Sequence, residues 1–181
     1  MRIIAGSLKG RIIKTVKGLT VRPMLDQIRE SLFNILGSSL SDATVIDCFA
    51  GSGAVGLEAL SRGAGKVIFF EENRVVAKVL RSNIEKCGVL NRAELIVGSL
   101  PASLKMVKEG VDIAFLDPPF GKAVGLKTLQ VVSTLKWLKK GALVIFRAPK
   151  EAELLDAYPP LHRYDQRIYG RSKLSFFRKT E

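Results

Sequence analysis

The sequence predicts an α/β protein with a doubly wound, mostly parallel sheet. Five short apolar runs lie at residues 44–47, 66–70, 93–97, 111–116 and 142–146, and stretches with helical spacing separate them. The runs are apolar at nearly every position, as expected for parallel strands that are covered on both faces. Strands that alternate with helices in this way are typical of α/β folds.

Two further strands are predicted near the C-terminus, at residues 163–169 and 173–177, joined at Gly170. Glycine suits a tight connection between antiparallel strands. We therefore expect a hairpin that closes a seven-stranded sheet.

The helices are predicted from apolar residues that recur every three or four positions. Leu25, Ile28 and Leu32 follow this spacing, and Gly37 ends the helix. Further helices are expected through residues 57–60, over 74–87, near 100–108 and over about 126–138. Residues 1–23 instead contain short apolar runs broken by glycines, which predicts a small β-hairpin extension before a domain of residues 24–181.

Composition excludes several classes of protein. A chain of 181 residues with 47% hydrophobic and 25% charged residues fits one folded domain rather than a disordered segment. No apolar run approaches the roughly 20 residues that span a bilayer. Cys48 and Cys87 show no metal-ligand spacing, and His162 is the lone histidine, so a structural zinc site or a hydrolase triad lacks its residues. We expect no metal, no membrane contact and a cytoplasmic location.

The charge predicts a polyanionic partner. Lysine and arginine total 29 against 17 acidic residues, which gives a formal charge of +12. A surplus of this size in a small domain favours nucleic acid, and the cations gather towards both ends of the chain. The candidate RNA-binding residues are Arg2, Lys9, Arg11, Arg22, Arg29, Arg171 and Lys173.

A glycine-rich loop predicts a cofactor site. Asp47 ends the first core strand, and Gly51, Gly53 and Gly56 follow in a G-x-G-x-x-G pattern at the start of a helix. The pattern alone is weak, because dinucleotide enzymes share it. Asp47, however, lies where it would face a cationic group. Glu71 and Glu72 end the second strand, where a carboxylate can accept hydrogen bonds from ribose hydroxyls. S-adenosylmethionine, a nucleoside with a charged amino-acid tail, fits these acids.

The turn Asp117-Pro118-Pro119-Phe120 predicts a site that holds an amine. It follows the apolar run 111–116. Asp117 and the carbonyl of Pro118 can accept two N–H hydrogens of an exocyclic amine, and two prolines fix the backbone in advance. Phe120 can stack on a base that has left its helix or loop. All four residues are candidate catalytic residues, and Asp117 also borders the cofactor.

With both motifs in view, the chain resembles the Rossmann-like S-adenosylmethionine-dependent methyltransferases, and most closely the RsmD family of 16S ribosomal RNA guanine-N2 methyltransferases. The resemblance covers nearly the whole chain, in the family's order. Its segments are Arg2–Gly6, Gly10-Arg11, Arg22-Pro23, Asp26, Arg29–Asn34, Asp47–Gly53, Glu58–Ala64, Asp117–Phe120 and Tyr169-Gly170.

The resemblance implies methylation of one guanine N2 in small-subunit ribosomal RNA, presented in a ribosomal particle or assembly intermediate, by a monomer. It also extends the candidate cofactor-binding residues, whose full set is Asp47, Phe49, Gly51, Ser52, Gly53, Glu71, Glu72, Ser99, Leu100 and Asp117. The chain departs from the family pattern at Met24, Ser99, Arg147 and Ser172. Arg147 in particular would change the charge at the rim of the site.

Three alternatives remain open. The same turn can hold adenine N6 in DNA or RNA. The glycine pattern also fits a nicotinamide-dependent oxidoreductase, which would leave the Asp117 turn and the charge without a role. A non-enzymatic RNA-binding assembly factor would have no use for the acids of the cofactor site.

Overall fold

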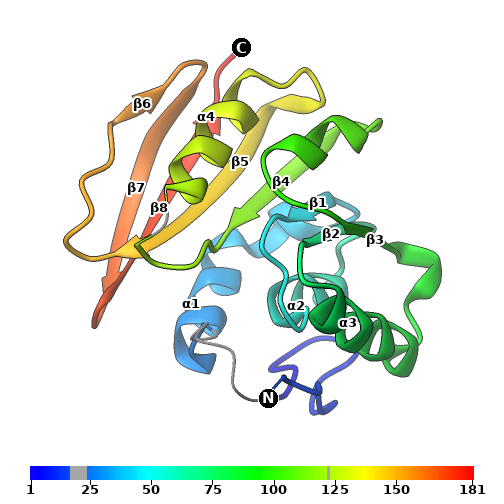
Figure 1. Cartoon of the computed structure of the whole chain (residues 1–181). Helices are drawn as coiled ribbons and strands as arrows, with labels where there is room; N and C mark the ends of the chain where they lie inside the picture. The colour runs from blue at the N-terminus through cyan, green and yellow to red at the C-terminus, as the bar shows by residue number, and fades with distance from the viewer. Residues whose placement is uncertain (17–23, 122) are drawn as a thin grey trace.

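The computed structural model describes residues 1–16, 24–121 and 123–181. One sheet of eight strands runs through this part of the chain in the order β3-β2-β1-β4-β5-β8-β7-β6, and helices lie on both of its faces (Figure 1). The prediction of an α/β fold with a mostly parallel sheet and a C-terminal antiparallel hairpin is confirmed.

The parallel half of the sheet contains the five predicted core strands. They are β1 (Thr44–Asp47), β2 (Lys66–Glu71), β3 (Ala93–Val97), β4 (Val111–Leu116) and β5 (Leu138–Pro149). The register places Asp47 beside Phe69 of β2 and Phe115 of β4. The strands β1, β2 and β4 therefore end at one edge of the sheet, where ligands bind in open α/β sheets.

The antiparallel half contains β6 (Ala157–Tyr158), β7 (Leu161–Tyr169) and β8 (Ser172–Lys179), with β8 paired to both β5 and β7. Gly170 makes the turn between β7 and β8 at φ 56°. The expected count of seven strands omits β6, because two residues at a sheet edge carry too little pattern to be recognised.

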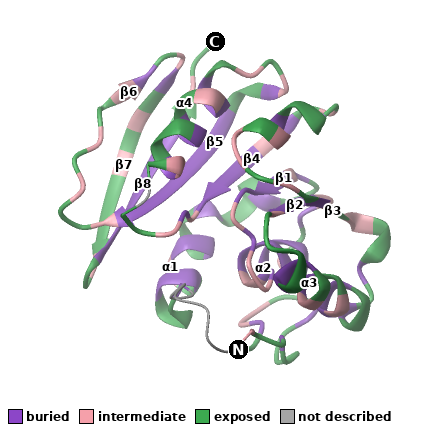
Figure 2. Cartoon of the chain, viewed as in Figure 1, coloured by how far each residue is buried: buried purple, intermediate pink, exposed green. Residues whose placement is uncertain are grey.

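Alternate strand residues belong to two separate cores. Val45, Phe69 and Phe115 pack in one cluster with residues of α1 (Asp26–Leu36), α2 (Ala54–Ser61) and α3 (Arg74–Cys87). The opposite positions, such as Ile46 and Ile68, pack with α4 (Val124–Thr134). The central strands are accordingly buried along their length, whereas β7 is largely exposed (Figure 2).

The helix boundaries agree closely with the sequence pattern in α1, which ends before Gly37, and in α3. The side chain of Asn73 accepts hydrogen bonds from the first turn of α3, and Gly88 ends it at φ 69°. The helix expected near 100–108 is the 3₁₀ helix η3 (Ala102–Met106). The helix expected to reach residue 138 ends at Thr134, because Leu138 already pairs with Val111 as the start of β5. Shorter 3₁₀ helices are η1 (Gly37–Leu40) and η2 (Leu90–Arg92).

The N-terminal segment, residues 1–16, folds back on itself and lies on α2. One isolated antiparallel bridge joins Arg2 and Ile12. The Glu58 carboxylate, fully buried on α2, accepts hydrogen bonds from the backbone N–H groups of Ile4 and Ala5 at 2.8 and 3.0 Å. Gly6 has φ 83°, and a Cβ there would lie 1.9 Å from the Ser61 carbonyl oxygen, so only glycine permits this approach.

Both cysteines, Cys48 and Cys87, are buried with free thiols. In the part of the chain that the structure describes, no helix has the length and apolar character needed to cross a membrane.

Candidate active site

Three acidic side chains gather at the carboxyl ends of neighbouring parallel strands: Asp47 at the end of β1, Glu71 at the end of β2 and Asp117 just after β4. Asp47 is 2% exposed, and its Oδ2 accepts a hydrogen bond from Gly56 N–H at 2.9 Å. Burial, together with smaller contributions from the charges of Asp117 and Glu71, raises the pKa of the Asp47 carboxyl to about 7. A buried negative charge is costly without a cation. Arg147 offsets the charge of Asp117, and the buried carboxylate of Asp47 favours a positively charged ligand.

Glu71 shapes the glycine loop. Its Oε2 accepts a hydrogen bond from Gly51 N–H at 3.0 Å, and its Oε1 accepts one from Asn73 N–H at 2.8 Å. One carboxylate therefore joins the loop after β1 to the start of α3. Burial raises the pKa of this carboxyl, while the two backbone donors oppose the rise.

The three glycines of the pattern have different functions. A Cβ at Gly53 would lie 2.4 Å from Leu80 Cδ1, and one at Gly56 would lie 2.2 Å from Phe69 Cε1. These two glycines let α2 pack closely on α3 and on the sheet. Gly51 has φ 55° and nothing within 4 Å of its Cβ position, so it is the glycine with open space for a ligand.

The other predicted cofactor residues form two groups. Glu72 and Ser99 line one open hollow of about 770 Å³, which Arg74 and Lys78 of α3 also border. Phe49 and Leu100 are partly buried, and both pack against the apolar cluster on the α4 face. The structure thus places Glu72 and Ser99 at one hollow, and Phe49 and Leu100 against one apolar cluster.

The Asp117 turn has a rigid base and an exposed tip. Pro118 is buried and packs so closely against Gly125 of α4 that a Cβ on that glycine would lie 2.4 Å from Pro118 Cγ. Phe120 is 45% exposed. Asp117 precedes both residues, and burial raises the pKa of its carboxyl while the Arg147 guanidinium opposes the rise.

Arg147 belongs to the site but was not among the predicted site residues. It lies on β5, and its Nη1 donates to both oxygens of Asp117 at 3.1 and 2.9 Å. The sequence signal is a single arginine within the apolar run of β5. Sequence reasoning noted its charge but could not pair it with Asp117, because the two residues are 30 positions apart.

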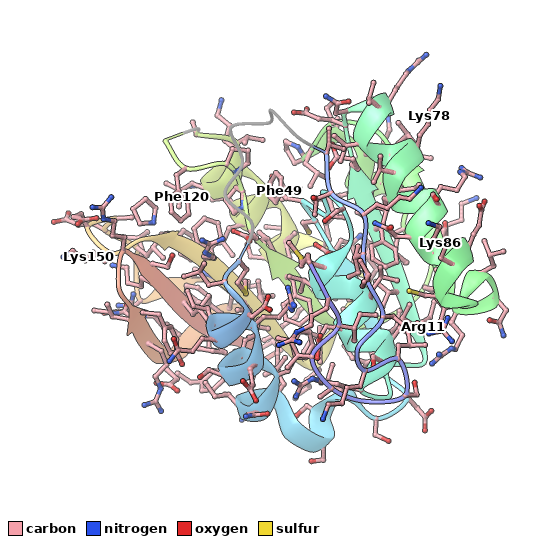
Figure 3. The ribbon with its side chains drawn as sticks, turned by 90° about the horizontal axis from the view of Figure 1, so that it is seen from below. Arg11, Phe49, Lys78, Lys86, Phe120 and Lys150 are labelled. Atoms are coloured by element: carbon pink, nitrogen blue, oxygen red, sulfur yellow. The ribbon has the colours of Figure 1, made fainter. Side chains whose placement is uncertain are left out.

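The predicted RNA-binding residues divide into exposed and buried sets. Arg2, Lys9, Arg11 and Arg171 are exposed, and Arg22 lies outside the described residues. In Figure 3, Arg11, Lys86 and Lys78 follow one side of the molecule, whereas Phe49 and Phe120 lie between them and Lys150.

Two members of that set are corrected by the structure. Arg29 is 0% exposed, and its guanidinium contacts Asp26, Glu58 and the carbonyl oxygen of Arg2. Lys173 is 8% exposed, and its amine donates to the Ala152 carbonyl oxygen. Both cations are therefore used inside the fold and cannot reach an RNA phosphate.

The residues present suit S-adenosylmethionine. The acidic cluster at Asp47 fits a cationic ligand, and the open side of Gly51 gives the ligand access to the loop. Among the described residues, no group of three or more histidine, cysteine, aspartate or glutamate side chains has the arrangement of a metal site.

The architecture and this site define a class I, Rossmann-like methyltransferase. A solved structure of the Escherichia coli protein yhhF superposes with a TM-score of 0.86 at 30% identity, covering 99% of this chain and 98% of that one. The chain belongs to the family described as Conserved hypothetical protein 95, whose model matches residues 1–178. This is the RsmD family predicted from the sequence.

Named relatives cover most of the chain. Ribosomal RNA small subunit methyltransferase D of Haemophilus influenzae is 36% identical over 159 residues, which are 86% of this chain and 82% of that protein. The protein of the same name from Escherichia coli is 35% identical over 165 residues, which are 90% of this chain and 83% of that protein.

Proposed function

We infer that this protein transfers a methyl group from S-adenosylmethionine to the exocyclic N2 amine of one guanine in 16S ribosomal RNA. The observation that carries this inference is the position of Asp117, a carboxylate on a proline-fixed turn at the end of β4, beside the acidic cluster of the cofactor loop. The names of the relatives supply the class of RNA.

The cofactor would be held by residues at the ends of β1, β2 and β3. Asp47 offers a buried negative charge for its cationic end, and the loop at Gly51 offers open backbone. Glu72 and Ser99 line a common hollow, which is suited to the nucleoside end. When bound, S-adenosylmethionine supplies the methyl group from its sulfonium.

The target amine is a poor nucleophile, because its lone pair is delocalised into the ring. Asp117 and the Pro118 carbonyl would accept its two N–H hydrogens and so aim the lone pair. Positioning of this kind can supply several kcal/mol of the reduction in barrier. Asp117 does not need to be a strong base, since the proton becomes acidic once the nitrogen carries the methyl group.

Phe120 would hold the base itself. Its ring is 45% exposed at the tip of the turn, so a base that has left its helix or loop can reach and stack on it. Stacking does not choose between guanine and adenine, and the choice of amine has to be measured.

The exposed cations would hold the RNA backbone. Arg2, Lys9, Arg11 and Arg171 lie on the surface, and the chain carries a net charge of +12. Contacts to phosphate position the substrate without reading its sequence, and their affinity falls steeply with salt. The substrate would be a small-subunit particle or assembly intermediate in the cytoplasm, bound by a monomer.

The test is transfer of a tritiated methyl group to naked 16S ribosomal RNA and to purified small-subunit particles, followed by nucleoside analysis of the product. We expect N2-methylguanosine, formed faster on the particle. N6-methyladenosine would overturn the choice of base. If no cofactor binds, the chain is not a methyltransferase, and binding of nicotinamide dinucleotides instead would identify an oxidoreductase.

A further inference from the structure

Arg147 is anchored in the candidate active site by three different groups. Its Nη1 donates to both carboxylate oxygens of Asp117, and its Nε donates to Ser172 Oγ at 3.3 Å. Its Cζ lies 5.1 Å from the centroid of the Phe120 ring. The residue is 6% exposed, so it is part of the floor of the site rather than a surface cation.

The contact with Asp117 affects the chemistry of the amine acceptor. Burial raises the pKa of Asp117, and the Arg147 guanidinium opposes that rise. A protonated carboxyl would present an O–H donor to the amine, whereas the ionised form presents only acceptors. Asp117 also interacts with the carboxylate of Asp47 on β1, and two neighbouring carboxylates disfavour each other's ionisation. Within the described residues, Arg147 is the cation paired with this cluster.

The contact between Arg147 and Phe120 affects where the target base would stack. A guanidinium near an aromatic ring gains from the ring's negative face. Phe120 is 45% exposed, so the contact with Arg147 can help to restrain its ring. The exposed part of the ring is available for a stacked base.

A competing interpretation makes Arg147 a stand-in for the substrate. A planar group that donates N–H to Asp117 and lies against Phe120 has the same contacts that the target base would make, so Arg147 would then have to leave. The hydrogen bond to Ser172 and the low exposure argue against departure, because separating a buried ion pair is expensive. A carboxylate also has about four lone-pair sites, enough to accept from Arg147 and from an amine together.

We propose that Arg147 is a positioning residue for the methyl acceptor: it stays in place during the reaction, holds the Asp117 carboxylate as the acceptor of the amine hydrogens and braces Phe120 beneath the target base. This proposal rests on the function inferred above, which gives Asp117 and Phe120 their roles.

The test compares Arg147→Met and Arg147→Lys with the wild-type protein, with Arg163→Met as the matched control. Arg163 also forms an ion pair with an aspartate, Asp156, but on β7. For each variant, kcat and KM for RNA are measured from pH 5.5 to 9, cofactor affinity is measured by calorimetry, and folding is checked by thermal unfolding.

We expect Arg147→Met to bind the cofactor within a few-fold of the wild type but to lose at least tenfold in kcat near neutral pH. The acidic limb of its rate profile should move to higher pH by about one unit, since loss of a nearby opposite charge raises a carboxyl pKa by this order. Arg147→Lys keeps the positive charge, so its pH–rate profile should lie closer to that of the wild type. Its kcat should be restored less, because lysine loses the planar contact with Phe120. Arg163→Met should match the wild type.

An unchanged rate and pH profile in a folded Arg147→Met protein would overturn the proposal. A lower KM for RNA with undiminished kcat would also overturn it, because Arg147 would then compete with the base. If Arg147→Met does not fold, the Lys variant decides, and wild-type kcat and profile in that variant would count against a planar brace. Asp117→Ala distinguishes failure of the proposed function from failure of the Arg147 proposal. If Asp117→Ala is active, Asp117 does not hold the amine, and the proposed mechanism is wrong. If Asp117→Ala is inactive while Arg147→Met behaves like the wild type, only the role of Arg147 is wrong.

Discussion

Asn83 on α3 donates a hydrogen bond to the carbonyl oxygen of Ser52 at 2.9 Å, so a side chain of the neighbouring helix holds the cofactor loop in position. The same side chain donates to the Lys14 carbonyl oxygen and accepts from Lys14 N–H, each at 2.9 Å. Asn83 is 1% exposed. One buried amide thus connects the N-terminal segment to the loop that is expected to bind S-adenosylmethionine.

Asn83→Leu should loosen both attachments. The substitution keeps the volume but leaves backbone groups of Lys14 and Ser52 without this partner, which costs about 1–3 kcal/mol for each buried group left unsatisfied. We expect lower stability, faster amide exchange around Lys14 and weaker cofactor binding. Chemical unfolding, hydrogen exchange and calorimetry test these three effects, with the exposed Glu85→Leu of the same helix as control. Unchanged exchange at both attachment points would contradict the connection.

Asp47→Asn should increase the stability of the protein above neutral pH and weaken cofactor binding. The pKa of Asp47 in the folded protein, about 7, lies above its ordinary value of 3.8, so ionisation destabilises the fold as pH rises from about 4 to 7. The penalty is complete above pH 7 and reaches roughly 4 kcal/mol at about 1.36 kcal/mol per unit of pKa. We therefore expect the Asn variant to be more stable than the wild type at pH 8 and similar to it near pH 4.

The same substitution should weaken cofactor binding, because it removes the charge that faces the cation. In the wild type, a cationic ligand favours the ionised carboxylate, so affinity should increase from pH 6 to 8 and binding should release protons. Calorimetry in buffers of different ionisation enthalpy measures that release. Equal affinity and equal proton release in the wild type and Asp47→Asn would exclude Asp47 as a partner of the cofactor.

Asp117→Ala should abolish methyl transfer while most of the cofactor affinity survives, since Asp117 is expected to act on the amine. The substitution also leaves the Arg147 guanidinium unpaired, so some loss of stability is expected. Asp117→Asn keeps an acceptor oxygen and serves as the companion variant, with transfer reduced at least a hundredfold. Single-turnover transfer with saturating cofactor is the measurement. Near wild-type turnover in Asp117→Ala would remove the residue from the mechanism.

Arg29→Ala should destabilise the protein without a specific effect on RNA binding. Arg29 and Glu58 side chains are both 0% exposed, and breaking a buried pair costs about 3 kcal/mol or more. Arg2→Ala is the contrast, because that side chain is exposed: its stability should change by less than about 0.5 kcal/mol, while RNA affinity and its salt dependence should decrease. The comparison uses urea unfolding and filter binding. A stable Arg29→Ala protein with weakened RNA binding would contradict the structure.

Sequence pattern predicted the fold because the central core strands are buried on both faces and therefore continuously apolar, whereas the edge strand β3 is only partly buried. The limits of α3 were also predictable, since Asn73 and Gly88 act within one turn of the helix ends. The two-residue β6 and the early end of α4 depend on pairing with strands distant in sequence, and no local signal encodes them.

The carboxylates of the site could be predicted from the sequence, whereas the positions of its arginines could not, and the reason is physical. The carboxylates Asp47, Glu71 and Asp117 follow recognisable strands, so their common edge can be deduced from topology. A charge count, in contrast, does not distinguish exposed arginines from buried ones. Arg29 was expected to contact RNA, but it pairs with Glu58 from another helix. The ion pair of Arg147 with Asp117 likewise exists only once β4 and β5 lie side by side.

The three glycines of the loop after β1 suggest how such loops can be redesigned. Gly53 and Gly56 set the distance between α2 and the elements it packs on, whereas Gly51 alone borders open space. In this chain, two glycines of the G-x-G-x-x-G pattern are therefore required for close packing of α2, and one position borders the space for a ligand. A library that seeks a new ligand preference should vary position 51 and its neighbours and keep positions 53 and 56 fixed.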